Sequence, residues 1–278
     1  MGRNYYQVLD QVHRSLYPRT YLEVGIYQGH ALNLALPGTR AVGVDPNPRI
    51  TSALPADAVV ERMTSDAFFA SGRLETHLGG QPLDLSFIDG MHLWEYSLRD
   101  FLNVERHCSH DSVVLLHDCL PHSAEMAARE EAPGWWTGDV WKLLFFLREE
   151  RPELDVVIVD AAATGLGIVR NFDPNRAPGD LDAVVDRYMG LEFDAFVDNL
   201  RPSLRIVPSD DASVLAVLPD RPWQPTGDVE RLVAERSRRR PSLSVRAASA
   251  RTTARQSPLV RSIFRGRRRL LERVSQRA

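Results

Sequence analysis

Four side chains that could carry acid–base or metal chemistry follow two apolar runs in the middle of the chain. Asp89 and His92 come after the run 83–88, and His117 and Asp118 come after the run 112–116. If these runs are neighbouring parallel strands, their carboxyl ends lie at one edge of the sheet. That edge is where open α/β sheets bind their ligands. We therefore expect the four side chains to meet in a functional site.

The four residues allow two kinds of chemistry. Asp89, His117 and Asp118 offer two carboxylates and one imidazole, a metal-ligand set that suits Mn²⁺ or Fe²⁺ better than Mg²⁺. His92 lies one helical turn beyond Asp89, so these two are the candidate catalytic residues, with His92 as a general base or a further metal ligand. Two plainer roles remain open: Asp89 as a helix cap and His92 as a buried structural histidine.

A second group of residues indicates a nucleoside-binding site. The run 21–24 leads into Glu23-Val24-Gly25-Ile26-Tyr27-Gln28-Gly29, where the two glycines allow a sharp turn and a close approach of ligand to backbone. Asp45 ends the next apolar run, 20 residues after Gly25, at the spacing of an acid that binds ribose hydroxyls. The turn lacks the G-x-G-x-x-G pattern that cradles a pyrophosphate, so a dinucleotide is disfavoured.

Strands and helices that would position these residues alternate along the chain. Apolar runs predict buried parallel strands at 21–24, 41–44, 58–62, 83–88 and 112–116, and an antiparallel pair at 155–160 and 167–170. A weaker run at 213–218 is a candidate for one more strand. Helical spacing follows at 94–102 and at 140–147, where Thr137 is the expected N-cap and Asp139 favours the helix start. We expect an α/β, Rossmann-like, doubly wound sheet of seven strands, mostly parallel with an antiparallel strand near the end.

These motifs resemble those of the class I S-adenosylmethionine-dependent methyltransferases. The resemblance rests on segments 23–29, 43–46 and 84–90 and on the His117-Asp118 strand end, and it covers about residues 20–170. More narrowly, Ile88-Asp89-Gly90-Met91-His92 is similar to the F-I-D-G-D-H-x-Y-E signature of a small-molecule O-methyltransferase family. That family includes macrolide-sugar, aminocoumarin-sugar and cephalosporin-type enzymes. Met91 stands where several relatives have Asp, and His117 stands where some have an acid.

The resemblance implies a cofactor, a reaction and an acceptor. The cofactor is S-adenosylmethionine, with a divalent metal (Mg²⁺, Mn²⁺ or Fe²⁺) as a second expected ligand. The residues expected to bind S-adenosylmethionine are Glu23, Gly25, Gly29, Asp45, Ser65, Asp66 and Asp89. The acceptor is a small polyhydroxylated molecule, such as a sugar or glycosylated metabolite, whose oxygen attacks the methyl group. N-methylation and a non-catalytic cofactor-binding module remain alternatives, and turnover of S-adenosylmethionine would separate the module from an enzyme.

An aromatic cluster follows the fifth expected strand. Trp135 and Trp136 lie where a lid over the acceptor would be expected. Two interpretations of this pair remain open. The rings stack against the acceptor, or they pack in the ordinary way at the start of a helix.

Charge divides the chain into two parts. The whole chain has a net charge of −3, yet residues 231–278 contain 15 arginines and two acidic residues, so residues 1–230 carry −16. We expect a methyltransferase domain over 1–222 and a basic, partly disordered tail over 223–278. The acidic domain argues against nucleic acid as a partner. In the tail, 259–274 fits a basic amphipathic helix that contacts anionic membranes, with a solvated tail as the alternative.

Two features predict the cellular compartment. Cys108 and Cys119 do not form a CxxC pair, so neither a disulfide framework nor a zinc site is expected. The sequence has no apolar segment typical of a signal peptide and no run of about 18 apolar residues. We expect a cytoplasmic protein, with the basic tail as its one point of membrane contact.

Overall fold

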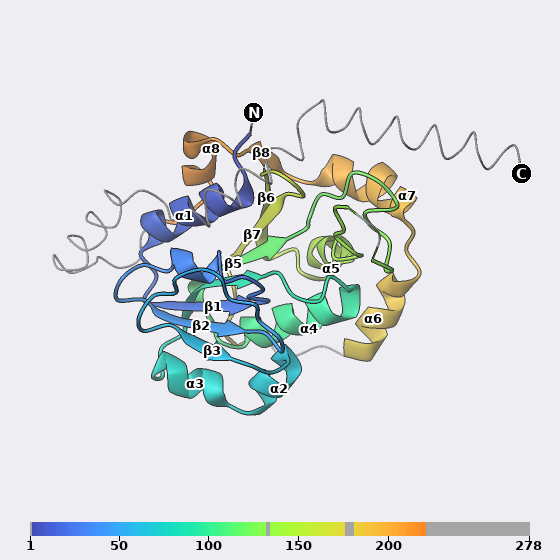
Figure 1. The fold of residues 1–278 in the computed structure, drawn as a ribbon. Helices are drawn as coiled ribbons and strands as arrows, with labels where there is room; N and C mark the ends of the chain where they lie inside the picture. The colour runs from blue at the N-terminus through green and yellow to red at the C-terminus, as the bar shows by residue number, and fades with distance from the viewer. Residues whose placement is uncertain (1, 132–133, 176–180, 221–278) are drawn as a thin grey trace, which may run out of the picture. The chain divides into compact units, whose positions relative to one another are not determined.

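The computed structural model describes residues 2–131, 134–175 and 181–220. These residues form one mixed sheet of eight strands in the order β3-β2-β1-β4-β5-β7-β6-β8, with helices on both faces (Figure 1). The strands are β1 (Thr20–Val24), β2 (Arg40–Val44), β3 (Val59–Glu61), β4 (Leu83–Ile88), β5 (Cys108–His117), β6 (Asp155–Asp160), β7 (Leu166–Arg170) and β8 (Ile206–Pro208). Strands β1 to β5 are parallel, and β7 runs antiparallel to β5 and β6.

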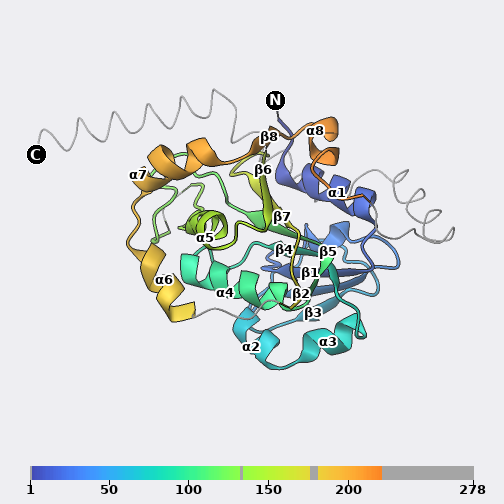
Figure 2. The same ribbon diagram turned by 180° about the vertical axis from the view of Figure 1, so that it is seen from behind.

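Side chains alternate between two hydrophobic cores, one on each face of the sheet. Leu22 and Val24 of β1 face the core that contains α4 and α5, whereas Tyr21 faces the core that contains α1. This alternation is the two-residue period of a strand that is buried on both faces. Both views place α1 beside α8 on the second face (Figure 2).

The helices have the following bounds: α1 (Tyr5–Leu16), α2 (Ser65–Ala70), α3 (Arg73–Leu78), α4 (Trp94–Glu105), α5 (Lys142–Glu150), α6 (Leu181–Met189), α7 (Phe193–Ala195) and α8 (Asp211–Leu215). Short helical turns occur at η1 (Leu32–Leu34), η2 (Phe196–Leu200) and η3 (Arg201–Ser203). A capping box starts α1, since the Asn4 side chain accepts from the Gln7 N–H and the Gln7 side chain accepts from the Asn4 N–H.

The five parallel strands and the antiparallel pair confirm the predicted α/β architecture. The prediction of seven strands is wrong, because the three-residue β8 pairs with β6 at the edge of the sheet. The expected strand at 213–218 is also wrong: the Asp210 side chain accepts a hydrogen bond from the Ser213 N–H and starts α8 instead. Thr137 does not cap α5, which follows Trp141; its hydroxyl donates to the Met126 carbonyl.

Two sequence-based predictions extend beyond the part of the chain that the structure describes. The domain boundary at 222/223 and the amphipathic segment 259–274 both fall in 221–278, outside the described residues. Within the described ranges, every helix is too short or too polar to cross a membrane.

Candidate active site

The loops of the site start at the same level along the sheet because the strands end in register. Val24 of β1 pairs with Val44 of β2 and with Ile88 of β4, and Ile88 pairs with Leu116 of β5. The strand order also reverses between β1 and β4, which opens a crevice at their carboxyl ends. The loops that follow these strands therefore form one ligand-binding edge.

The glycine turn after β1 packs directly against the loop after β4. Gly25 has φ +89°, and a Cβ at this position would lie 2.0 Å from the Asp89 carbonyl oxygen. Only glycine permits both the backbone conformation and the contact. The turn therefore places the expected cofactor loop in contact with the backbone of Asp89.

Asp45 is held by the same glycine turn. Its Oδ2 accepts hydrogen bonds from the N–H groups of Ile26 (3.0 Å) and Tyr27 (2.9 Å), and its Oδ1 accepts from the Asn47 N–H (2.7 Å). A carboxylate has about four acceptor positions, so these three bonds leave capacity for a ribose hydroxyl. Asp45 is half-buried at the carboxyl end of β2, where the expected role requires it.

Glu23 is a buried carboxyl group within β1. Its side chain is 1% exposed and accepts a hydrogen bond from the Tyr21 hydroxyl at 2.9 Å. Burial raises the pKa of Glu23 well above its ordinary value, although the Tyr21 bond opposes this shift. Glu23 therefore has a polar partner inside the protein before any ligand binds.

The expected adenine-side residues lie in the first turn of α2. The exposed Asp66 forms an ion pair with Arg99 of α4 at 2.9 Å. Ser65 hydrogen-bonds to Asp100, a buried α4 carboxyl group that the sequence reasoning missed. Burial raises the pKa of Asp100 to about 7, with the Ser65 bond acting in the opposite direction. The sequence did offer a signal for this buried carboxyl group, because Asp100 is next to the apolar positions of the predicted helix 94–102.

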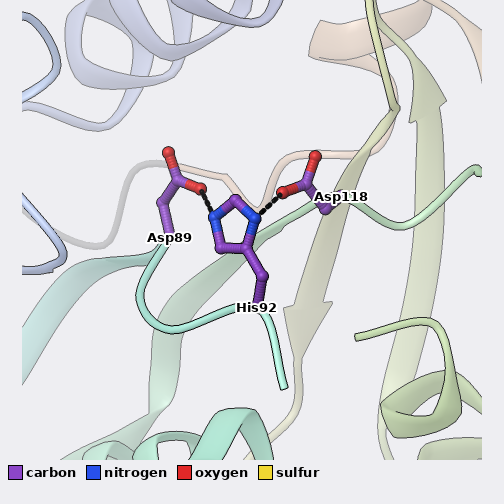
Figure 3. Close-up of side chains that lie close together, drawn as sticks. All are labelled: Asp89, His92 and Asp118. Carbon is purple, nitrogen blue, oxygen red and sulfur yellow. Dashed lines mark ion pairs between the residues drawn. The ribbon is translucent and has the colours of Figure 1, made fainter. Parts of the chain in front are cut away.

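Asp89, His92 and Asp118 form a compact cluster at the ends of β4 and β5. The His92 ring lies between the two carboxylates, with Nε2 3.3 Å from Asp89 Oδ1 and Nδ1 3.1 Å from Asp118 Oδ2 (Figure 3). One ligand atom from each residue lies within 4.8 Å of the others, as a metal site requires. The Asp118 Oδ2 atom is buried, and among the described residues it forms an ion pair with the His92 ring.

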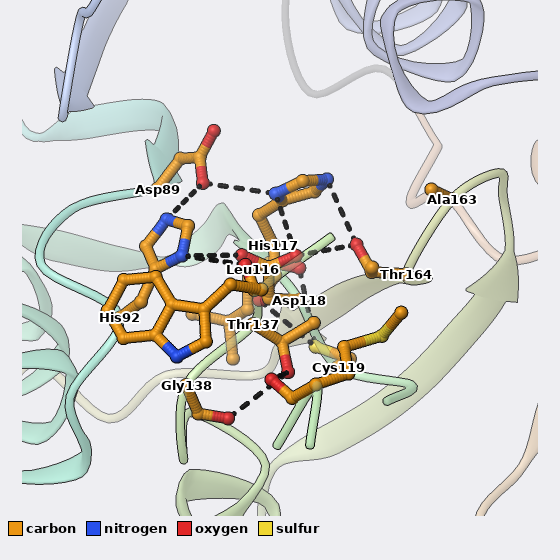
Figure 4. Close-up of polar contacts among 12 residues, drawn as sticks. Asp89, His92, Leu116, His117, Asp118, Cys119, Thr137, Gly138, Ala163 and Thr164 are labelled. Carbon is orange, nitrogen blue, oxygen red and sulfur yellow. Dashed lines mark hydrogen bonds and ion pairs between the residues drawn. The ribbon is translucent and has the colours of Figure 1, made fainter. Parts of the chain in front are cut away.

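His117 supports this cluster from the side. Its Nδ1 lies 3.0 Å from Asp89 Oδ1 and 3.3 Å from Asp118 Oδ1 (Figure 4). The Thr164 hydroxyl, from the turn before β7, donates to Asp118 Oδ1 at 2.6 Å and lies 3.4 Å from His117 Nε2. The Tyr5 ring of α1 covers His117, with ring centroids 4.1 Å apart.

The structure brings all four predicted residues together, but their arrangement differs from the expected ligand set. The three groups that converge include His92, whereas the sequence analysis grouped His117 with the two aspartates. His117 instead contacts both carboxylates through its Nδ1 and packs against Tyr5. His92 therefore belongs to the group whose ligand atoms converge, and His117 contacts the same two carboxylates.

The charges of the cluster stabilise one another. Burial lowers the pKa of His92, but the negative charges of Asp118 and Asp89 outweigh this effect and raise the pKa to about 9. For Asp89 and Asp118, burial raises the pKa, yet the neighbouring histidines lower it below the ordinary value. The same two carboxylates raise the pKa of His117 well above its ordinary value, against the effect of burial, so at neutral pH and without a metal the two carboxylates lie beside two imidazolium groups.

Two residues of the cluster have unusual backbone conformations. His92 has φ +56° and Asp118 has φ +60°, in the left-handed region that residues other than glycine rarely adopt. Such a conformation costs on the order of 1–3 kcal/mol and persists where the surroundings enforce it. The contacts around His92 and Asp118 therefore have to hold them in place.

Two comparisons with known proteins used the sequence of this chain. Residues 22–119 match the family described as "Methyltransferase domain". This segment runs from β1 to the end of β5, and it includes the glycine turn and all four site residues. A search with the sequence finds no match among curated proteins.

Several solved structures are similar to this chain. One is an O-methyltransferase from Bacillus cereus in complex with SAH (13% identity, TM-score 0.45, covering 59% of this chain and 79% of that chain). Another is the O-methyltransferase TomG from Streptomyces achromogenes, involved in tomaymycin synthesis, in complex with SAM (14% identity, TM-score 0.46, 60% and 79%). A third is cofactor-bound Rv0187 from MTB (16% identity, TM-score 0.46, 60% and 78%). Residues 22–119 are thus similar to a methyltransferase domain.

Proposed function

We propose that this enzyme transfers a methyl group to an oxygen of a small polyhydroxylated acceptor, such as a sugar or glycosylated metabolite. We further propose that Asp89, His92 and Asp118 hold a divalent cation there. The observation that carries the proposal is the convergence of these three side chains at the edge where the glycine turn and Asp45 lie. Hydroxyl groups are natural ligands for a cation held by carboxylates.

The adjacency of the two loops supports direct transfer. When bound, S-adenosylmethionine supplies an electrophilic methyl group. Gly25 contacts the backbone of Asp89, so an acceptor near the Asp89 side chain also lies near the cofactor loop. Asp45 would fix the ribose and Asp89 the acceptor side, which aligns the two reactants. Alignment of this kind contributes roughly 7–11 kcal/mol in favourable systems.

The donor set supports a cation more than a free histidine base. An imidazole with a pKa of about 9 is protonated at pH 7 and accepts no proton from an acceptor hydroxyl. A divalent cation held by Asp89, His92 and Asp118 would take the place of that proton and would lower the pKa of a nearby hydroxyl. With one nitrogen and two carboxylate ligands, Mn²⁺ and Fe²⁺ fit better than Mg²⁺. His92 is therefore proposed as a ligand.

The test is methyl transfer to a panel of sugars, glycosides, catechols and amines, with products located by mass spectrometry and NMR. We expect methylation at oxygen, loss of activity after chelation, and recovery with Mn²⁺. Full activity in enzyme shown by elemental analysis to be free of metal would refute the cation. Methylation of amines alone would replace the proposal with N-methylation.

A further inference from the structure

Asp139 is a buried carboxylate outside the cluster, and it accepts a hydrogen bond from the Trp94 N–H at the start of α4. We propose that Asp139 is a positioning residue, which holds His92 in the site by capping α4 from a distant loop. This inference rests on the proposed function, because the position of His92 matters for a cation held between Asp89 and Asp118. It concerns a contact that extends over 45 residues of sequence.

The start of α4 depends on Asp139. The residue at the N-cap position, Leu93, has no side chain that can accept a hydrogen bond. The Trp94 N–H donates instead to Asp139 Oδ1 at 2.7 Å. A carboxylate that accepts from the first turn of a helix satisfies an otherwise unpaired N–H and interacts favourably with the helix dipole. Since His92 lies two residues before Trp94, fixing Trp94 restricts the backbone of His92.

The segment that carries Asp139 also encloses His92 directly. A Cβ at Gly138 would lie 1.7 Å from the His92 carbonyl oxygen, so the two backbones are in close contact. The Trp136 ring stacks on the His92 ring with centroids 5.3 Å apart, and its carbonyl oxygen lies 3.4 Å from His92 Nδ1. These contacts supply the support that the left-handed conformation of His92 requires.

Asp139 is itself held firmly. It is 1% exposed, and its Oδ2 accepts from Arg129 at 2.7 Å and lies 3.1 Å from Lys142 Nζ. Arg129 also binds Glu95 of α4, and Lys142 donates to the Met189 carbonyl oxygen at 2.6 Å. One carboxylate oxygen therefore caps α4, while the other joins a network of charges. The two roles can be separated by substitution.

The experiment compares Asp139→Asn with Asp139→Glu. Asparagine keeps an oxygen for the Trp94 N–H but loses the charge, whereas glutamate keeps the charge but displaces the oxygen by a methylene. Asp84→Glu is the matched control, because Asp84 is a buried carboxylate near the amino end of β4 that accepts from the Arg19 N–H and guanidinium. The measurements are Mn²⁺ and SAH affinity by calorimetry, and the His92 ring signals in NMR spectra, assigned with His92→Gln.

We expect Asp139→Glu to weaken Mn²⁺ binding about tenfold or more, as is typical when a residue that orients a metal ligand is changed. Its His92 signals should move, and its SAH affinity should stay within about twofold. Asp84→Glu should keep both the Mn²⁺ affinity and the His92 signals, and Asp139→Asn, which keeps the oxygen that accepts from Trp94 but loses the bonds to Arg129 and Lys142, should move the His92 signals less than Asp139→Glu. If Asp139→Glu does not fold, Asp139→Ala replaces it with the same expected result.

Three outcomes would overturn the inference: unchanged His92 signals in Asp139→Glu, equal effects of Asp139→Asn and Asp139→Glu, or an equal effect of Asp84→Glu. If the unsubstituted enzyme binds no Mn²⁺, the proposed cation fails, but the His92 signals still decide whether Asp139 positions this residue. The two proposals can therefore fail separately.

Discussion

The affinity for Mn²⁺ should depend steeply on pH, because the cation must displace a proton from His92. Asp118 and Asp89 overcome the effect of burial and raise the pKa of His92 to about 9. At pH 7, two units below that value, only about 1% of the imidazole is neutral. Each unit corresponds to about 1.4 kcal/mol, so protonation should cost on the order of 3 kcal/mol of apparent binding free energy at pH 7.

The sign follows from which form binds metal. Below pH 9 His92 carries the proton, so raising the pH from 6 to 8 should tighten Mn²⁺ binding about tenfold per unit, and the gain should level off near pH 9. Calorimetry in buffers of different ionisation enthalpy should count at least one proton released per Mn²⁺ at pH 7, because Asp118 and Asp89 also raise the pKa of His117. His77→Gln is the control, because His77 pairs with Glu61 outside the cluster.

Two results would refute this reasoning. One is a dissociation constant that does not change between pH 6.5 and 8.5, with no proton released. The other is loss of the pH dependence in His117→Gln together with its retention in His92→Gln. The second result would restore the ligand set Asp89, His117 and Asp118 that the sequence predicted.

Four further predictions concern the fold, the cofactor and the tail. Asp45→Ala should weaken SAH binding by about 1.5–3 kcal/mol, the value of a hydrogen bond to a charged group, and unchanged affinity in calorimetry would exclude the ribose role. Burial raises the pKa of Asp100 from 3.8 to about 7, so the free energy of unfolding should fall as pH rises between these values, by on the order of 4 kcal/mol. Urea titrations at pH 5 and pH 8 should show about 3 kcal/mol of that fall in the unsubstituted protein and not in Asp100→Asn, because about two of the three pH units lie in this interval; an equal fall in both would contradict the assignment. Gly25→Ala should lower the melting temperature more than Gly80→Ala, because both glycines have positive φ but nothing lies within 4 Å of a Cβ at Gly80; equal melting temperatures would contradict the loop contact. We also propose that the basic tail binds anionic membranes, so a chain that ends at residue 236 should keep SAH binding but lose binding to anionic vesicles, an idea that fails if the full chain ignores such vesicles at low salt.

Sequence patterns predicted the centre of the sheet well because its strands are long apolar runs. The edge was harder to predict: β8 has only three residues, two of them exposed, and so lacks the apolar run that marked the others. This segment is a strand because it pairs with β6, and no local sequence pattern predicts that pairing. The helix at α8 depends on the Asp210 cap and not on the apolar residues that suggested a strand.

The sequence predicted which residues would lie together in the site, but it did not predict how their side chains would be arranged. Strand ends in register were enough to place Asp89 and Asp118 together. The choice of His92 over His117 depends on a left-handed backbone at His92 and on its contact with Gly138, more than 40 residues away in sequence. Asp139 likewise caps α4 and not the helix that follows it, because tertiary contacts determine its partner.

The hydrogen bond from Thr164 to Asp118 has a consequence for how the enzyme forms. Residues 22–119 contain the four residues at the carboxyl ends of β4 and β5, yet Thr164 reaches Asp118 from the turn before β7, and Tyr5 covers His117 from α1. Chain segments on both sides of residues 22–119 therefore complete the polar cluster at this edge. Because β7 lies between β5 and β6 in the sheet, the turn that carries Thr164 reaches Asp118 only when β7 is paired with β5.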